Sequence, residues 1–195
     1  MAVYEGPWVL NRRIADQAER LGDRTAVVVP DSETISYGDL ADRAARTARG
    51  LVTLGIAPGD RVATMLPSSP GYLEAWLGTA WAGAVDVPVN TAYKGYFIEK
   101  VVNQTGARVV IVDDELLEEV VRVDLPTVEH IVPISPHDPR RVRAGGDRSS
   151  ADWPVADGVR DPRVRDSRML THAPPLPLVS RSETDPVYVI FTSGT

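Results

Sequence analysis

The sequence predicts an α/β fold in which a parallel sheet carries helices on both faces. Between residues 36 and 134, short apolar runs typical of buried strands alternate with stretches of helical periodicity. The centres of four runs, near residues 63, 86, 110 and 131, are about 21 to 24 residues apart, which is enough for a strand, a helix and two short loops. This spacing is typical of parallel strands joined by right-handed crossovers.

Two helices begin at recognisable capping signals. The segment SYGD at residues 36–39 fits the S-x-x-D capping box, and it precedes a face of leucine and alanine that Gly55 ends. Ser69 precedes Pro70, which is favoured in the first turn of a helix, and Gly83 follows the last apolar residue of that helix.

The remaining elements follow from the same two periodicities. An opening helix at 11–21 leads into a hairpin of residues 26–29 and 34–37. Two further helices are expected at 93–105, closed by a glycine, and at 113–123. The four strands are expected at 61–66, 84–89, 108–112 and 129–134.

Composition excludes several classes of function. The 195 residues include 43% hydrophobic and 25% charged residues, which is the globular average. The net charge of −6 offers no basic surface for a nucleic acid, so nucleic acid is not an expected partner. Disulfides and cysteine ligands are excluded because the chain has no cysteine, and its three histidines are too scattered for a zinc motif.

Targeting signals are not expected either. The first residues lack the charged and apolar regions of a signal peptide. The most apolar stretch, residues 75–85, is also much shorter than the roughly 20 residues of a membrane helix. We therefore expect no transmembrane segment and a cytoplasmic location.

Residues 135–182 interrupt the alternation of strands and helices. They hold seven of the 16 prolines, and nine arginines against six acids, without a sustained apolar period. We interpret them as a long, partly disordered surface connection. The alternative is a basic arm for anionic partners, although the interleaved aspartates dilute its charge. The chain then divides into an N-terminal α/β subdomain (1–134), this linker (135–182), and a strand with the start of a loop (183–195).

The last segment joins a strand to a loop of hydroxyl side chains and glycine. Residues 185–191 (DPVYVIF) are mostly apolar and predict a buried strand, and Thr192, Ser193, Gly194 and Thr195 follow it. Such a loop suits phosphate because glycine lets backbone amides approach closely, while hydroxyl groups donate hydrogen bonds to phosphate oxygens. A plain turn is the alternative, and the spacing is not that of a Walker A loop.

Three sequence blocks resemble the N-terminal part of the adenylate-forming superfamily, the acyl-CoA synthetases and their relatives. They run from ISYGDL to VPVN, from NTAYKG to VVIVD, and through DPVYVIFTSGT, and they cover residues 35–113 and 185–195. The second block is most similar to carnitine/crotonobetaine-CoA ligases and fatty-acyl-CoA synthetases. The third resembles the opening of the family's phosphate loop, [ST]-[SG]-G-[ST]-[ST]-G-x-P-K-G.

The resemblance implies a two-step ligation that uses ATP, Mg²⁺, a carboxylic acid and coenzyme A. Thr192, Ser193, Gly194 and Thr195 would belong to the phosphate loop. The family's adenine pocket, metal-binding glutamate, ribose-binding aspartate and the lysine of its mobile C-terminal domain would lie beyond residue 195, so no catalytic and no metal-binding residue carries over. We therefore expect an N-terminal portion of the domain that is inactive by itself.

Two other classes remain as alternatives. The first is a non-catalytic binding or interaction protein that retains half of the adenylate-forming fold. The second, a dinucleotide-binding oxidoreductase domain, is disfavoured because no G-x-G-x-x-G follows a predicted strand. The sequence leaves the identity of the acid and the oligomeric state open.

Three further groups have a structural interpretation that we prefer to a functional one. Residues 90–94 are interpreted as a helix cap rather than a ligand site, and the acids of 113–119 as a solvated helix N-terminus rather than a metal site. Trp76 and Trp81 are expected to pack in the core rather than to stack on a ligand.

Overall fold

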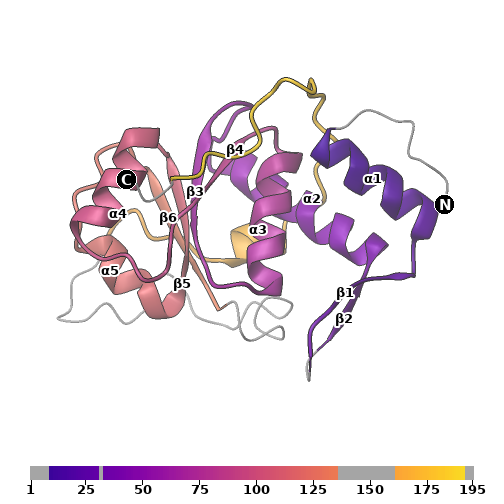
Figure 1. The fold of residues 1–195 in the computed structure, drawn as a ribbon, viewed down its shortest axis with the longest axis horizontal. Coiled ribbons are helices and arrows are strands. Elements are labelled where there is room, and N and C mark those ends of the chain that lie inside the picture. The colour runs from indigo at the N-terminus through magenta and orange to yellow at the C-terminus, as the bar shows by residue number, and fades with distance from the viewer. Residues whose placement is uncertain (1–8, 31–32, 136–160, 192–195) are drawn as a thin grey trace.

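The computed structural model describes residues 9–30, 33–135 and 161–191 (Figure 1). Its centre is a sheet of four parallel strands in the order β4-β3-β5-β6. In the register of the sheet, Val62 lies opposite Asp86 on one side and Val109 on the other. The strands are β3 (Arg61–Met65), β4 (Val85–Pro88), β5 (Val109–Asp113) and β6 (His130–Ile134).

The N-terminal elements form a helix, a hairpin and a second helix, as the sequence predicts. They are α1 (Leu10–Leu21), the antiparallel pair β1 (Thr25–Val28) and β2 (Thr34–Ser36), and α2 (Tyr37–Thr53). Ser36 caps α2, because its hydroxyl accepts a hydrogen bond from the Asp39 amide at 3.0 Å. Apolar residues of α1 pack against alanines of α2.

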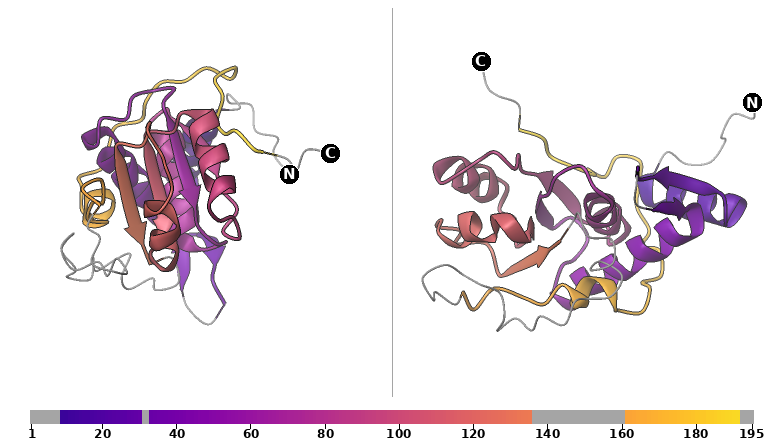
Figure 2. Two further views of the ribbon diagram at one scale, coloured as in Figure 1. Left: turned by 90° about the vertical axis from the view of Figure 1, so that its left-hand side faces the viewer. Right: turned by 90° about the horizontal axis from the view of Figure 1, so that it is seen from below.

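The remaining helices cover both faces of the sheet, which confirms the predicted fold class. They are α3 (Pro70–Trp81), α4 (Tyr96–Thr105), the 3₁₀ turn η1 (Asp114–Leu116) and α5 (Leu117–Val121). The chain steps from β3 outward to β4 and then crosses back to β5 on the other side of β3. Right-handed crossovers in opposite directions put α3 on one face and α4 and α5 on the other, as Figures 1 and 2 show.

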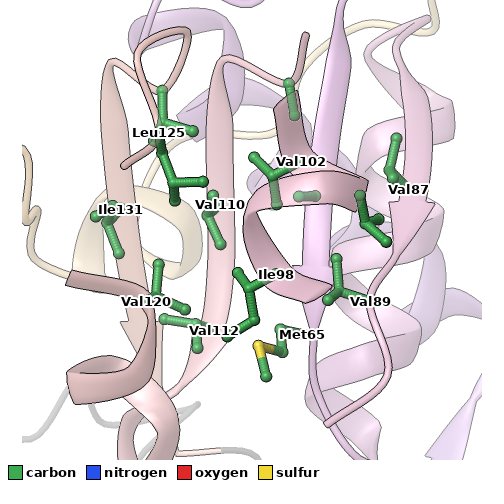
Figure 3. Close-up of a cluster of buried hydrophobic side chains, with 14 of the residues drawn as sticks. Met65, Val87, Val89, Ile98, Val102, Val110, Val112, Val120, Leu125 and Ile131 are labelled. Atoms are coloured by element: carbon green, nitrogen blue, oxygen red, sulfur yellow. The ribbon is translucent and has the colours of Figure 1, made fainter. Parts of the chain in front are cut away.

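Alternating strand residues divide the core between these two faces. Val110 and Val112 of β5 pack with α4 and α5, whereas Val109 and Ile111 pack with residues of α2 and α3. Figure 3 shows Ile98 of α4 directed into the first of these clusters. Both faces of the strands are therefore buried, which explains why the strands are continuous apolar runs in the sequence.

Residues 161–182 differ from the predicted surface connection, because they pack against the fold. A short helix, α7 (Arg168–Thr171), lies against α2, and Leu170 is only 3% exposed. Val164 forms a parallel bridge with Ile131 at the edge of β6. These apolar residues are isolated and have no period, so only their contacts with distant parts of the chain reveal them. Residues 136–160 lie outside the described residues, and the three-part division of the chain remains a prediction.

The predicted buried strand at 185–191 is also different in the structure. Only Tyr188 makes a bridge, with Asp86 at the edge of β4, and Tyr188 and Ile190 are 54% and 60% exposed. One side of this segment pairs with β4, and no strand pairs with its other side within the part of the chain that the structure describes. The segment therefore lies at the edge of the sheet and is not buried as predicted.

None of the helices among the described residues is both long and apolar enough to cross a bilayer.

Candidate functional site

The four residues predicted to bind phosphate, Thr192, Ser193, Gly194 and Thr195, lie outside the described residues. The structure does describe the chain up to Phe191, the residue before them. The described part of the candidate site is therefore the segment that leads into the loop.

This segment runs parallel to β4 and is joined to it by two backbone hydrogen bonds. The Asp86 amide donates to the Val187 carbonyl at 2.9 Å, and the Val189 amide donates to the Asp86 carbonyl at 2.8 Å. Phe191 then packs on the core cluster beside α4. Because the pairing is parallel, the segment heads toward the edge where β3 to β6 have their carboxyl ends. Ligands of open α/β sheets bind outside that edge.

Arg181 fastens the beginning of the same segment. Its side chain is 5% exposed. One guanidinium nitrogen donates to the Ala84 carbonyl at 3.0 Å, and the other donates to the Pro186 carbonyl at 2.6 Å. Ala84 immediately precedes β4, so Arg181 ties the incoming segment to the start of the strand with which it pairs.

Asp86 combines this backbone role with a buried carboxyl group. The residue is 1% exposed, and its Oδ1 accepts a hydrogen bond from the Thr64 hydroxyl at 2.8 Å. Its Oδ2 is buried and has no hydrogen-bond partner among the described residues. Burial raises the pKa of Asp86 to about 7, although the hydrogen bonds from Thr64 and from the Val87 amide oppose the rise. Burial also raises the pKa of Tyr72, and the charge of Asp86 adds to that effect.

Residues 90–94 form a local turn and not the expected helix cap, because Gly95 is the N-cap of α4. Asn90 Oδ1 accepts a hydrogen bond from the Ala92 amide at 2.9 Å, which is an Asx turn. The Lys94 ammonium is 2.5 Å from Glu119. The expected helix begins only at Tyr96, after this turn.

The acids of residues 113–119 begin a helical segment, as expected. Asp113 Oδ1 accepts a hydrogen bond from the Glu115 amide at 3.1 Å and so caps η1. The predicted helix over 113–123 is divided into η1 and α5. Across residues 9–30, 33–135 and 161–191, no group of three or more His, Asp or Glu side chains could hold a metal ion.

The two tryptophans of α3 pack in the core, as expected. Trp81 is 7% exposed and lies with Trp76 among the apolar contacts of α1 and α2. The indole nitrogen of Trp81 donates to the Leu176 carbonyl at 2.9 Å. Trp81 therefore holds the chain that follows α7.

A polar pocket of about 320 Å³ lies between α2, α3 and the end of α7. Four of its charged side chains are paired within the chain. Arg43 contacts Glu74 at 2.9 Å and Glu33 at 3.0 Å, and Arg46 contacts Asp42 at 2.7 Å. No strand residue lines this pocket, so it is separate from the segment that leads to the loop.

Sequence reasoning did not identify Arg181 or Asp86. A signal existed for Asp86, because a carboxylate in the middle of an apolar strand is costly unless it has a partner or a proton. Arg181 gave no signal, since it is one of nine arginines in a segment without periodicity.

Comparison with known proteins identifies a matching family. The family model described as AMP-binding enzyme matches residues 14–195. The long-chain-fatty-acid–CoA ligase FadD13 of Mycobacterium tuberculosis is 29% identical over 189 residues, which are 96% of this chain and 32% of the relative. A crotonobetaine/carnitine–CoA ligase of Salmonella paratyphi B is 29% identical over 92% of this chain and 33% of the relative. The chain thus spans about a third of the length of these relatives.

Solved structures agree on the fold. The anthranilate CoA ligase AuaEII, in complex with anthranoyl-AMP, superimposes with a TM-score of 0.76 at 21% identity, over 96% of this chain and 33% of that one. A long-chain-fatty-acid-CoA ligase (FadD1) of Archaeoglobus fulgidus gives a TM-score of 0.75 at 19% identity, over 100% of this chain and 36% of that one.

Proposed function

Because the chain belongs to the AMP-binding enzyme family, we propose that it is the N-terminal part of an ATP-dependent acyl-CoA ligase. In the proposed first step, a carboxylate oxygen attacks the α-phosphorus of ATP, and pyrophosphate leaves. In the second step, the thiol of coenzyme A attacks the acyl carbonyl of the acyl-AMP, its proton is lost, and AMP leaves. The proposal keeps the cytoplasmic location expected from the sequence.

The observation that carries the proposal is the pairing of residues 187–189 with β4. Its parallel direction leads the chain toward the carboxyl edge of the sheet, and the sequence Thr-Ser-Gly-Thr follows two residues later. Phosphates bind well where backbone amides and hydroxyl groups follow a strand at such an edge.

Under this proposal Thr192, Ser193, Gly194 and Thr195 act on the phosphates of ATP. The hydroxyl groups donate hydrogen bonds to phosphate oxygens, and Gly194 lets backbone amides come close to them. Mg²⁺ would offset the negative charge of the triphosphate. The described part of the chain offers no cluster of acids for that ion, so its ligands are expected outside this part.

The test is ATP–pyrophosphate exchange that depends on an added carboxylic acid. We expect none from the 195 residues alone, because the family's loop continues past Thr195 with a second glycine and a lysine. A chain continued through its native downstream sequence is expected to show exchange and saturable ATP binding. Exchange by the 195 residues that survives repurification would contradict the expected inactivity of this part alone.

Two matched variants of the continued chain locate the phosphate contact. Ser193→Ala removes a hydroxyl from the proposed loop, and we expect a tenfold or greater loss of exchange. Ser167→Ala removes a hydroxyl next to α7 and is expected to leave exchange unchanged. If the continued chain binds no ATP and shows no exchange with a panel of acids, the non-catalytic alternative replaces this proposal.

A further inference from the structure

The chain after α7 is held to the fold by side chains that donate to its backbone. We call residues 173–191 the returning segment. Its carbonyl oxygens at Ala173, Leu176 and Val179 accept hydrogen bonds. The donors are Arg46 of α2, Trp81 of α3 and Asn11 of α1, at 3.2, 2.9 and 2.9 Å respectively.

This mode of attachment follows from the sequence of the returning segment. It contains prolines at 174, 175, 177 and 186, which have no backbone N–H to donate. The segment therefore cannot form a regular ladder over that stretch, and its position depends on these side-chain donors and on single backbone bonds such as that from the Leu176 amide to the Ala45 carbonyl at 2.9 Å. Such donors act at separate points, so each sets the position of the backbone near it.

Arg181 is the last of these donors before the pairing with β4. It is the one whose guanidinium reaches both the fold and the segment, at Ala84 and Pro186. The turn over residues 182–185 brings Pro186 back to the Arg181 side chain. In this turn the Asp185 carboxylate accepts a hydrogen bond from the Ser182 amide at 2.8 Å and lies 3.7 Å from Arg181 Nε. The side chain of Arg181 thus closes the turn and joins it to the start of β4.

The pairing that follows depends on Asp86 of β4, whose backbone amide and carbonyl face the edge of the sheet although its side chain is buried. The Val85 amide points inward and donates to the Asp60 carbonyl at 2.8 Å, whereas the Asp86 amide points outward and donates to Val187. The two backbone hydrogen bonds of Asp86 hold residues 187–189 to the edge of β4, and the hydrogen bond from Arg181 holds Pro186, the residue before them. Two backbone bonds at an exposed edge form a weak pairing on their own.

We propose that Arg181 is a positioning residue for the phosphate loop, because it sets the place at which residues 187–191 join the edge of β4. This inference rests on the proposed function only for the identity of the loop. The clamp itself is a property of the described residues, so it can be tested without any activity.

Hydrogen exchange of individual amides in the 195-residue chain tests the clamp. In Arg181→Ala, the Asp86 and Val189 amides, which make the two hydrogen bonds of this pairing, are expected to exchange about tenfold faster or more, because two charge-assisted hydrogen bonds are lost. The inward Val85 amide is expected to keep its rate. Arg165→Ala is the matched control, since Arg165 also donates to two carbonyls, those of Pro162 and Val164, but lies elsewhere.

Equal acceleration at Val85 and Asp86 would show general destabilisation and would overturn the proposal, as would unchanged exchange at Asp86 and Val189. Arg181→Lys keeps the charge and one hydrogen bond, so it is expected to give an intermediate rate. If Arg181→Ala does not fold, Arg181→Lys carries the test with the same two outcomes.

Exchange of pyrophosphate in the continued chain tests the link to the loop. Arg181→Ala is expected to raise the KM for ATP about tenfold and to leave the KM for the acid unchanged, whereas Arg165→Ala should change neither. An unchanged KM for ATP, in a chain whose wild type is active, would overturn the positioning role. An inactive wild type would count against the proposed function, while the hydrogen exchange result would still decide whether Arg181 is a clamp.

Discussion

Asp86→Asn is expected to remove a pH dependence from the stability of the fold. The Asp86 carboxyl keeps its proton up to a pH of about 7 in the folded chain, because burial raises its pKa from the ordinary value of 3.8. In the unfolded chain it loses that proton near its ordinary pKa. Between these two values the folded chain holds more protons, so the native protein loses stability as the pH rises from about 4 to about 7.

The size of this effect follows from the two pKa values. Each pKa unit corresponds to about 1.4 kcal/mol, which makes the loss about 4 kcal/mol between about pH 4 and about pH 8. An asparagine at residue 86 has no proton to lose. It can still accept the hydrogen bond from Thr64, but its amide hydrogens meet the buried position where Oδ2 has no partner among the described residues.

Urea unfolding of both chains at about pH 4 and about pH 8 measures this effect. The fixed cost of burying the asparagine amide is the same at both pH values, so it cancels in the comparison. The stability of the variant relative to the native chain should therefore rise by about 4 kcal/mol. Asp23→Asn, at an exposed position, is the control. Parallel pH profiles for the native chain and Asp86→Asn would refute the reasoning.

Three other experiments test the packing of α2, the exposed apolar surface and the order of proteolytic cleavage. Gly50→Ala would bring a Cβ within 2.2 Å of the Met169 carbonyl oxygen; we expect a loss of about 2 kcal/mol in urea unfolding, and none in Gly38→Ala, where the nearest atom is 3.4 Å away. Ile190→Asn is expected to reduce the fluorescence of a dye that binds apolar surface, because Ile190 is 60% exposed; undiminished fluorescence would place the dye elsewhere. Limited trypsin digestion should cut first within the proline-rich and arginine-rich stretch and later at the packed Arg163, and first cuts between residues 40 and 112 would contradict this order. The expected early sites are Arg140, Arg141, Arg143 and Arg148.

Local signals were sufficient wherever a short stretch of sequence decides its own structure. The Ser36 and Ser69 hydroxyls cap helices because they lie three residues before an amide that needs a partner. The apolar runs are strands because both faces of a parallel sheet are buried, and their spacing leaves room for a crossover helix between successive strands. The family also follows from short blocks of sequence, and the same blocks carry the prediction of the phosphate-loop residues.

The attachment of residues 161–191 was decided only by the tertiary structure. Leu170 has no periodic neighbours, so no local pattern predicts its burial, whereas the apolar run around Tyr188 wrongly predicts that Tyr188 is buried. Leu170 is buried because Gly50 lets the backbone of α7 approach α2, and Tyr188 is exposed because its segment lies at the edge of β4.

The roles of Asp86 and Arg181 were likewise decided only by the tertiary structure. The sequence by itself determined an α/β sheet, its helices and the family of the chain, because those depend on periodicity and on contiguous motifs. Tertiary structure decided that burial raises the pKa of a carboxyl group in β4 and that an arginine 97 residues after Ala84 binds its carbonyl. Burial and contact across such separations depend on the whole packed fold, so no stretch of sequence encodes them alone.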